Sequence, residues 1–504
     1  MNIVTLLEMA AEVFPDRVAI TDGAEHLTYG ELLEAAQAAG RAIRASGAAY
    51  VSLLDIGSLA APVALYGAAY AQVPYVPLNY RLAKPEIEAL IQRVTPVFLI
   101  AGATYSDPLQ LGAGVTLVES ASFLTACRSA GPGDVLAASE EPRAVAVQLF
   151  TSGTTGTPKA AILRHDNLTA YILGTVEFGA ADEDEATLVS VPPYHIAGIS
   201  AVLSSTYAGR RMVQLGNFDA ARWLDLAGSE RVSNAFLVPT MLARIVEHLD
   251  AARALPELPA LSAIAYGGGK MPLSVMARAM ALFPKVDFTN AYGLTETSST
   301  ICLLDPEDHR AAALSSDPAI RKRLGSVGRA LATVELEIRD EAGTALPAGE
   351  AGYVFVRGEQ VSGEYRGAGS LLDAEGWFPT RDRGMLDAGG YLFLDGRADD
   401  VIVRGGENIS PGEIEEVLLS HPSVAEAAVV AVPDEEWGEG VGAAIVLKPG
   451  AAVSTGELQD WVRTRLRSSR VPATIRFRRE LPYNELGKLL RRVVKQDFAD
   501  TGAR

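Results

Sequence analysis

Short apolar runs alternate with helical patterns over most of this chain, and no other feature constrains its fold as strongly. Runs typical of buried strands are AVAVQLF (144–150), ATLVSV (186–191), SNAFLV (233–238) and LSAIAYG (261–267). Segments with apolar residues at helical spacing lie between them. Strands that alternate with helices form layered α/β structures with mainly parallel sheets. We therefore expect an α/β fold of layered sheets and helices.

The pattern changes after about residue 325. Short alternating strands, VELEIRD and GYVFVRG, flank a turn-rich stretch and predict a small β-rich subdomain at about 325–395. The remainder interleaves strands with helices into a compact unit of its own. We expect a large N-terminal domain over 1–395 and a small mobile C-terminal α+β domain over 396–504.

Two helix starts are legible in that C-terminal part. Ser410 precedes Pro411 and is followed three residues later by Glu413, which predicts a capped helix with a capping box. Ser454 and Glu457 have the same spacing and predict a second box.

Charge and cysteine content exclude some classes of function. The 504 residues have a net charge of −18 and a pI near 4.9, which argues against a general nucleic-acid binder because such proteins need a basic face. The two cysteines, Cys127 and Cys302, have no disulfide or metal-ligand spacing. A reducing, cytoplasmic location is therefore expected.

The apolar segments do not predict a membrane span. The N-terminal residues carry early acidic residues and do not resemble a signal peptide. Their apolar positions predict an amphipathic core helix: Ile3, Leu6, Leu7, Ala10 and Phe14. The most apolar stretch, Ala60–Ala71, is too short to span a bilayer. These patterns do not decide whether the folded protein makes loose contact with a membrane surface.

A glycine- and hydroxyl-rich loop, TSGTTGTPK (151–159), follows the apolar run that ends at residue 150. Small residues let backbone N–H groups approach a phosphate, hydroxyls donate further hydrogen bonds, and a lysine adds positive charge. The spacing does not match the Walker P-loop, since proline precedes Lys159 and alanine follows it. A flexible surface loop is the alternative interpretation of this stretch alone.

Five motifs in order resemble the acyl-adenylate-forming enzymes, which include acyl-CoA and aryl-CoA ligases, peptide-synthetase adenylation domains and firefly luciferase. They are TSGTTGTPK (151–159), NAYGLTETS (290–298), GWFPTRDRG (376–384), DGRADDVIVRGGENISPGEIE (395–415) and LPYNELGKLLRR (481–492). The resemblance implies a reaction in two steps. A carboxylate attacks the α-phosphate of Mg·ATP to give acyl-AMP and pyrophosphate, and a thiol then displaces AMP. ATP, Mg²⁺ and coenzyme A are the implied cofactors.

The resemblance also implies roles for residues around the phosphates and adenine. Glu296 would hold Mg²⁺ with Thr151, and Thr295 would lie near the α-phosphate. Tyr292 would stack on adenine within the motif that begins at Asn290, although a core aromatic is the alternative. The other wall would come from Gly267, Gly268 and Gly269. The phosphate loop would comprise Thr151, Ser152, Gly153, Thr154, Thr155, Gly156 and Lys159.

By the same resemblance, Asp382 would accept hydrogen bonds from the ribose hydroxyls, with Arg397 on the same sugar. Lys488 would bridge the substrate carboxylate and the α-phosphate. His195, in PPYHIAG, would lie at the acyl pocket, although a core histidine is the alternative. Asp399 resembles the hinge. Candidates along the CoA path are Gly405, Gly406 and Trp437.

Two cations depart from the family pattern. Arg381 stands before Asp382, where glycine is usual, and Arg404 stands where lysine or a small residue is more usual. Arginine does not simply replace lysine. The thioester-forming step is therefore the less secure half of the expectation.

We expect a carboxylic acid–CoA ligase whose substrate is a fatty or other hydrophobic acid. The alternatives are an aromatic acid–CoA ligase and a stand-alone adenylation enzyme that loads a carrier protein; a catalytically silent nucleotide-binding protein is a third. Asp219 could mimic the amine-binding aspartate of adenylation domains, but its place before a helical pattern predicts an N-cap instead. The sequence shows no basic residue that must pair with a second substrate carboxylate, although Arg210 and Arg211 could do so.

Overall fold

The computed structural model describes residues 1–131, 133–151, 158–253, 255, 257–397, 400–405, 407–434, 436–483 and 489–499. Some predicted site residues lie outside these ranges: Ser152, Gly153, Thr154, Thr155, Gly156, Asp399, Gly406 and Lys488.

The described chain forms two compact units. The first comprises Met1–Glu335 with Val356–Phe378, and the second comprises Leu336–Phe355 with Pro379–Arg504. Residues 336–355 and 379–395, expected in the N-terminal domain, thus pack within the second unit. The domain boundary after residue 395 and the hinge near Asp399 stay predictions.

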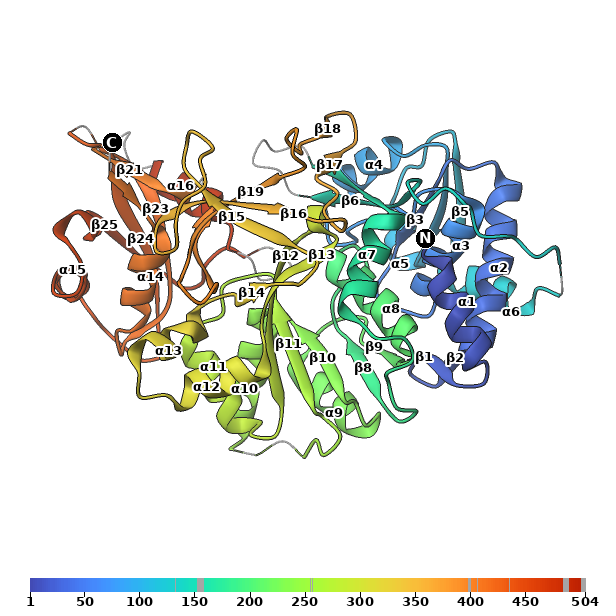
Figure 1. The fold of residues 1–504 in the computed structure, drawn as a ribbon, viewed down its shortest axis with the longest axis horizontal. Coiled ribbons are helices and arrows are strands. Elements are labelled where there is room, and N and C mark those ends of the chain that lie inside the picture. Colours follow the sequence, from blue (N-terminus) through green and yellow to red (C-terminus); the bar gives the residue numbers. More distant parts are fainter. Residues whose placement is uncertain are drawn as a thin grey trace. The chain divides into compact units, whose positions relative to one another are not determined.

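A nine-stranded mixed sheet forms the centre of the first unit, and β8, β10 and β11 run side by side in it (Figure 1). Its strand order is β14 (Arg329–Ala330), β13 (Ser299–Leu304), β12 (Asp287–Leu294), β11 (Ala263–Gly267), β10 (Asn234–Leu237), β8 (Ala186–Val189), β9 (Arg211–Gln214), β1 (Val18–Asp22) and β2 (Glu25–Thr28). Strands β8 to β12 pair in parallel, as their alternation with helices predicts.

Helices pack against this sheet through their buried faces. They are α7 (His165–Thr175), α8 (Ile196–Ala208), α9 (Ala220–Ser229), α10 (Pro239–Ala252), α11 (Leu273–Leu282) and α12 (Pro306–Leu314). Asp219 caps α9, because its side chain accepts a hydrogen bond from the Arg222 N–H at 2.9 Å. The N-cap prediction for Asp219 is thereby confirmed.

Two further sets of strands complete the first unit. Parallel strands β3 (Tyr50–Leu54), β4 (Val97–Ala101) and β5 (Val115–Glu119) form one set. The other runs in the order β18 (Gly369–Ser370), β17 (Glu364–Tyr365), β7 (Lys159–Arg164) and β6 (Val145–Thr151). Tyr75 bridges the sets by pairing with Val51 and Val147.

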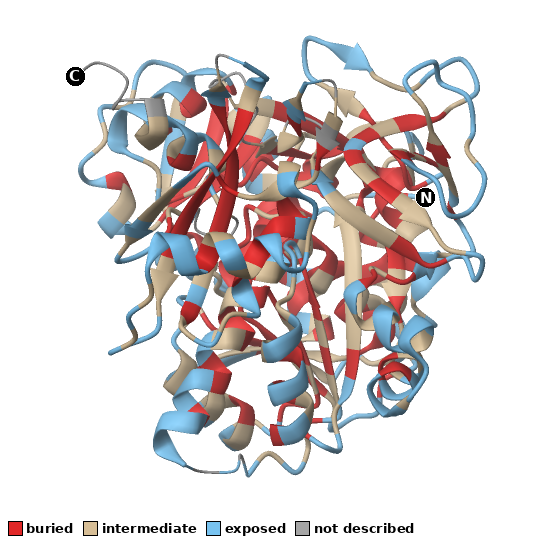
Figure 2. Cartoon of the chain, turned by 90° about the vertical axis from the view of Figure 1, so that its left-hand side faces the viewer, coloured by how far each residue is buried: buried red, intermediate tan, exposed pale blue. Residues whose placement is uncertain are grey.

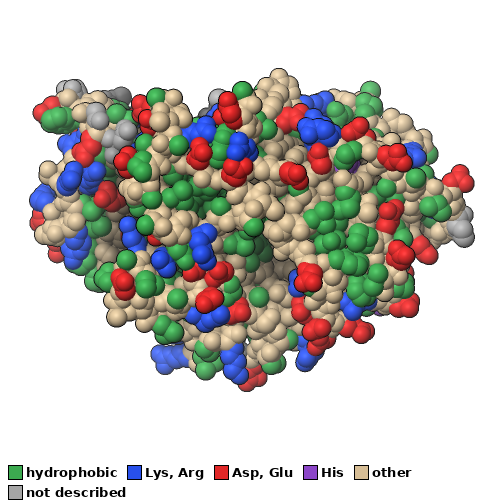
Figure 3. All heavy atoms as spheres, in the orientation of Figure 1, with side chains coloured by type: hydrophobic (Ala, Val, Ile, Leu, Met, Phe, Trp, Pro, Cys, Tyr) green, Lys and Arg blue, Asp and Glu red, His purple; other side chains and the backbone are tan. Residues whose placement is uncertain are grey.

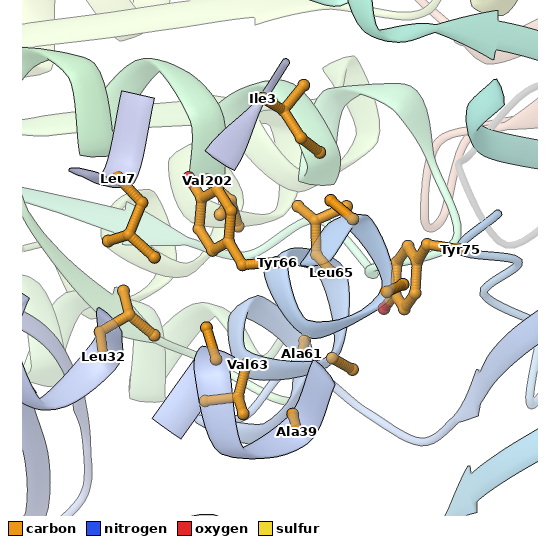
Figure 4. Packing of buried hydrophobic residues seen from close by; sticks show 14 of the residues in the cluster. Ile3, Leu7, Leu32, Ala39, Ala61, Val63, Leu65, Tyr66, Tyr75 and Val202 are labelled. Carbon is orange, nitrogen blue, oxygen red and sulfur yellow. The ribbon is translucent and has the colours of Figure 1, made fainter. Parts of the chain in front are cut away.

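The N-terminal helices form an alanine-rich core with these strands. They are α1 (Val4–Val13), α2 (Tyr29–Ser46) and α3 (Ala60–Ala71), with α4 (Lys84–Gln92), α5 (Ala103–Ser106) and α6 (Ser120–Ser129) nearby in the chain. Leu7 of α1 and Leu32 of α2 point toward each other, with Tyr66 of α3 beside them (Figure 4). The amphipathic helix predicted near the N-terminus is confirmed.

Helix α3 is buried along its whole length, as a helix that is apolar all round must be. Small alanines let it approach α2 closely: a Cβ on Gly67 would lie 2.6 Å from the Ala39 Cβ. Among the described residues, every helix is too short or too polar to traverse a bilayer.

The second unit contains two sheets of its own. One runs in the order β15 (Glu335–Arg339), β16 (Ala351–Arg357), β19 (Phe378–Leu386) and β20 (Leu392–Arg397), with β19 and β20 antiparallel. The other comprises β21 (Ile402–Arg404), β22 (Glu407–Ile409), β23 (Val424–Asp434), β24 (Gly438–Leu447) and β25 (Thr474–Arg478). Its helices are α14 (Pro411–Leu419), α15 (Thr455–Arg463) and α16 (Arg491–Ala499).

One of the two predicted capping boxes is wrong. The Ser410 hydroxyl donates to the Asp395 carbonyl at 2.6 Å and makes no cap bond, and the Glu413 carboxylate pairs with Arg470 at 3.3 Å. Tertiary partners outcompete the local cap here. The box of Ser454 and Glu457 is confirmed at the start of α15.

Burial follows the elements in both units. Buried residues lie along the strands and on one side of the helices, while exposed residues lie on the outer helix faces and in loops (Figure 2). On the face seen in Figure 3, basic and acidic side chains are interspersed.

Candidate active site

The predicted phosphate loop connects two paired strands. Strand β6 ends at Thr151 and β7 begins at Lys159, and these two residues are register partners in an antiparallel pair. The Thr151 hydroxyl donates to the Lys159 carbonyl at 3.4 Å, and Arg93 donates to the Pro158 carbonyl at 2.8 Å. The described ends of the loop are thus held together.

The Lys159 ammonium faces an aromatic ring instead of a carboxylate. Its Nζ lies 5.8 Å from the centre of the Tyr365 ring, within reach of a cation–π attraction. Among the described residues, no carboxylate forms an ion pair with Lys159.

Glu296 lies in a tight turn between β12 and β13. A single 3₁₀ turn, Thr295–Thr297, is followed by Ser298 and Ser299 with φ of 55° and 115°. Non-glycine residues rarely adopt such angles, and they persist only where surrounding contacts enforce them. A Cβ on Gly293 would lie 1.8 Å from the Ser299 carbonyl oxygen, so the turn also needs glycine there.

A segment from later in the chain holds this turn. The N–H groups of Ser362 and Gly363 donate to the Glu296 carbonyl at 2.9 and 3.1 Å. The Gln360 side-chain amide donates to the carbonyls of Thr297 and Thr300 at 3.0 and 2.8 Å.

The Glu296 side chain has a partner as well. The Tyr365 hydroxyl donates a short hydrogen bond to Oε1 of the Glu296 carboxylate. Neither Tyr365 nor Gln360 was predicted as a site residue. Their contacts with the turn span more than 60 residues of sequence, and no local pattern signals such a contact.

The glycine wall follows β11. Gly267 is the register partner of Ala291 in β12, and a Cβ there would lie 2.1 Å from the Ala291 carbonyl oxygen. Gly268 has φ of 82°, in the left-handed region that favours glycine, and a Cβ on Gly269 would meet only ordinary contacts. The three glycines therefore differ: the first two are required by the backbone and the third is not.

A buried hydrogen-bonded pair, Tyr266 and His309, lies next to this wall, because Tyr266 directly precedes Gly267 in the chain. The Tyr266 hydroxyl lies 2.9 Å from Nε2 of His309, and Nδ1 of His309 lies 2.8 Å from the Asp305 carbonyl oxygen. A carbonyl only accepts, so Nδ1 carries the proton and the Tyr266 hydroxyl donates to Nε2. Burial lowers the pKa of His309 and favours this neutral form. The sequence provided no signal for this pair.

The two adenine candidates have different surroundings. The Asn290 side-chain amide donates to the Ser326 carbonyl at 3.1 Å, a contact within the protein. Tyr292 is half-buried on β12 as the register partner of Cys302.

His195 occupies the N-cap position of α8. Its ring lies 4.4 Å from the Tyr194 ring, and its Nε2 is shielded from solvent without a hydrogen-bond partner among the described residues. Burial, followed by the charge of Arg81, lowers the pKa of His195 to about 3. Tyr80 packs against both Tyr194 and Tyr105, at ring distances of 5.4 and 5.1 Å. A neutral imidazole thus adjoins a cluster of tyrosines.

In the second unit, the predicted ribose residues meet. Asp382 and Arg397 are register partners on β19 and β20, and the Arg397 Nε lies 3.0 Å from Oδ1 of Asp382. Asp382 is buried, and its N–H donates to the Thr380 hydroxyl at 3.1 Å. The preceding Arg381 has φ of 63°.

The described CoA-path candidates also meet. Gly405 has φ of 57°, and a Cβ there would lie 2.6 Å from the Trp437 ring. The Arg404 guanidinium lies 5.8 Å from the same ring and donates to the Ser469 carbonyl at 3.0 Å. Arg404 is therefore held by its own unit.

Other candidate charges have structural partners. Arg210 pairs with Glu185 at 2.8 Å, and Arg211 pairs with Glu230 at 2.7 Å. In the described ranges, no group of three or more His, Cys, Asp or Glu side chains gathers to hold a metal. Glu296, whose second carboxylate oxygen has no hydrogen-bond partner among the described residues, fits a Mg²⁺ site made of one carboxylate and substrate phosphates.

Comparison with known proteins places these residues in a family. The model of the AMP-binding enzyme family matches residues 7–366, and that of the AMP-binding enzyme C-terminal domain matches residues 413–488. A feruloyl-CoA synthase from Amycolatopsis is 31% identical over 97% of both chains. A fatty acid–[acyl-carrier-protein] ligase from Streptomyces coeruleorubidus is 30% identical over 97% of this chain and 95% of its own.

A solved structure extends the likeness to the fold. The o-succinylbenzoate coenzyme A synthetase of Bacillus subtilis, in complex with ATP and a magnesium ion, superposes with a TM-score of 0.83. It is 28% identical and is matched over 97% of this chain and 98% of its own.

Proposed function

The chain belongs to the AMP-binding enzyme family, and on that premise we propose that it is an AMP-forming carboxylic acid–CoA ligase. One observation carries the proposal: a cation, Lys159, and a carboxylate, Glu296, contact the same tyrosine side chain. A nucleoside triphosphate with Mg²⁺ needs both, a cation for its phosphates and a carboxylate for the metal.

The first step joins the acid to AMP. Lys159 binds the β- and γ-phosphates at the end of the loop, and Thr295 lies at the α-phosphate. Glu296 binds Mg²⁺ through the carboxylate oxygen that Tyr365 leaves open, with Thr151 as the second proposed ligand. When bound, Mg²⁺ neutralises charge on the phosphates and on the departing pyrophosphate. Lys488 holds the substrate carboxylate in line with the α-phosphorus.

Nucleoside recognition divides between two groups of residues. The adenine lies between Tyr292 and the backbone of Gly267–Gly269, where Gly267 and Gly268 keep the wall free of side chains. The Asp382 carboxylate accepts from the ribose hydroxyls while Arg397 fixes its orientation at 3.0 Å. Rotation near Asp399 would exchange Lys488 for the CoA path along Gly405, Gly406 and Trp437.

The substrate is a hydrophobic acid, with a fatty acid as the first candidate. An aromatic acid is the second, and the tyrosine cluster beside His195 favours it, because aromatic rings pack well against tyrosine edges and faces. The feruloyl-CoA synthase is a relative with an aromatic acid in its name. We also propose a cytoplasmic enzyme, in keeping with two buried free cysteines.

AMP release from Mg·ATP across a panel of fatty and aromatic acids, with and without CoA, tests this function. Release that depends on both an acid and CoA supports the ligase, and the ranking of acids identifies the pocket. Acid-dependent pyrophosphate exchange without CoA turnover would contradict the CoA assignment and favour a carrier-protein acceptor. No acid-dependent release with any panel member would contradict adenylation itself.

A further inference from the structure

We propose that Tyr365 is a positioning residue for the nucleotide site: its hydroxyl orients Glu296 for Mg²⁺, and its ring separates Glu296 from Lys159. The inference rests on the proposed function, which assigns the metal to Glu296 and the phosphates to Lys159.

Strand pairing places Tyr365 near Lys159. Strand β17 pairs with β7, and Tyr365 is the register partner of Ala161. Residues two apart on a strand share one face, so Ala161 and Lys159 lie on the same side of β7. A long side chain opposite Ala161 therefore reaches Lys159 diagonally across the two strands.

A half-buried ion pair fixes the register that this placement needs. The Arg164 Nε and Nη2 donate to the two carboxylate oxygens of Glu364, each at 3.0 Å. The bidentate geometry resists sliding of β17 along β7. The Arg366 N–H adds a bond of 2.9 Å to the Ala160 carbonyl.

Residues 360–365 also form hydrogen bonds with the turn that contains Glu296. Backbone N–H groups of Ser362 and Gly363 hold the Glu296 carbonyl, and the Gln360 amide holds the carbonyls of Thr297 and Thr300. The carboxylate, its backbone and the ring near Lys159 thus share one support. A shift of this segment would move both charges of the site.

The Tyr365 hydroxyl selects which carboxylate oxygen meets the metal. It donates to Oε1, while Oε2 has no hydrogen-bond partner among the residues that the structure describes. Hydrogen bonds to a ligating carboxylate fix its rotamer before the metal arrives, and their loss costs about 10- to 100-fold in metal affinity. The side-chain entropy that Glu296 loses on adopting one rotamer is then lost during folding, and not when the metal binds.

The ring has a second effect, which is to hinder an ion pair between Lys159 and Glu296. An ammonium and a carboxylate that meet in a partly buried site attract each other strongly. Lys159 lies over the Tyr365 ring and Glu296 accepts from the Tyr365 hydroxyl, and among the described residues the two charges form no ion pair with each other. Both charges stay ready for Mg·ATP.

The test measures Mn²⁺, as a spin-active substitute for Mg²⁺, binding to the full-length protein with α,β-methylene-ATP by electron paramagnetic resonance. Tyr365→Phe keeps the ring and removes the hydroxyl. We expect about tenfold weaker Mn²⁺ binding and an affinity for the metal-free nucleotide within about twofold of wild type, since the ring still shields Lys159. Mn²⁺ affinity equal to that of wild type would overturn the inference.

Tyr171→Phe is the matched control. The Tyr171 hydroxyl lies 3.4 Å from Oγ1 of Thr300, near the same turn, whereas the described hydrogen bond to the Glu296 carboxylate comes from Tyr365. Its Mn²⁺ affinity should equal that of wild type. An equal loss in the Tyr171 and Tyr365 variants would assign the effect to the turn as a whole and overturn a specific role for Tyr365.

Glu296→Gln separates this inference from the proposed function. If Mn²⁺ affinity falls in Glu296→Gln but not in Tyr365→Phe, the metal assignment holds and the positioning role fails. If Mn²⁺ affinity is unchanged in Glu296→Gln, the metal assignment itself fails. Tyr365→Leu should also weaken binding of the metal-free nucleotide, because Lys159 can then pair with Glu296.

Discussion

Arg381 has a left-handed backbone, with φ of 63°, at an exposed position of β19. An L-residue with a Cβ is strained there by roughly 1–2 kcal/mol, and glycine is not. The related motif usually has glycine at this place, so the backbone requirement remains although the residue has changed. Asp382, the next residue, nonetheless meets Arg397 at 3.0 Å.

Arg381→Gly should therefore raise the free energy of unfolding by up to about 1 kcal/mol, after the entropy cost of glycine is subtracted. Urea denaturation followed by tryptophan fluorescence measures this. Arg383→Gly is the control, because the Arg383 guanidinium lies 5.2 Å from the centre of the Tyr353 ring on β16, and this variant should lose stability instead. A loss of stability in Arg381→Gly would refute the strain.

At the scale of the element, strands β11 and β12 approach so closely at Gly267 that no side chain fits there. The parallel pair sets Gly267 against Ala291, and a Cβ on Gly267 would lie 2.1 Å from a backbone oxygen. Backbone cannot rotate aside as a side chain can. The glycine run thus meets a packing requirement at its start, before any ligand is considered.

Gly267→Ala should lower the free energy of unfolding by about 1–3 kcal/mol, the usual range for overpacking a tight site. Gly269→Ala is the matched control, since its Cβ would meet nothing closer than 3.7 Å, and its stability should change by less than about 0.5 kcal/mol. Comparing the urea unfolding midpoints of the two variants with that of wild type tests this prediction. Equal midpoints would mean that β12 moves aside freely.

At the scale of the whole molecule, buried histidines link stability to pH. His165 is 3% exposed and its Nδ1 accepts from the Ile3 N–H at 3.4 Å. Burial, with the charge of the N-terminus, lowers the pKa of His165 from 6.5 to about 4. Burial likewise lowers the pKa values of His195 and His309.

A histidine whose pKa is lower in the folded than in the unfolded state binds its proton more readily on unfolding. Its contribution is complete above pH 6.5 and is lost as the pH falls toward about 4, by up to about 1.4 kcal/mol per pH unit for each such group. His165→Asn, which retains an acceptor for Ile3, should flatten the stability curve in this window. The exposed His248, changed to Gln, should not. Parallel curves for wild type and His165→Asn would contradict the linkage.

Sequence alone determined the α/β class, the order of the motifs and several local features of this protein. Strand runs, the helix at the N-terminus, the N-cap of Asp219 and the box at Ser454 depend on neighbours in the chain, and local patterns record such neighbours. The pairing of Asp382 with Arg397 follows from two motifs on adjacent strands.

Only the tertiary structure decided which groups support those motifs. The Ser410 hydroxyl donates to the Asp395 carbonyl instead of capping its own helix. The Tyr365 hydroxyl donates to Glu296 across 69 residues of sequence, and the Tyr266 hydroxyl donates to His309 across 43. A hydrogen bond between distant segments depends on strand register and on burial, which no local spacing encodes. For that reason the chemical groups could be predicted from the sequence, and the side chains that hold them in place could not.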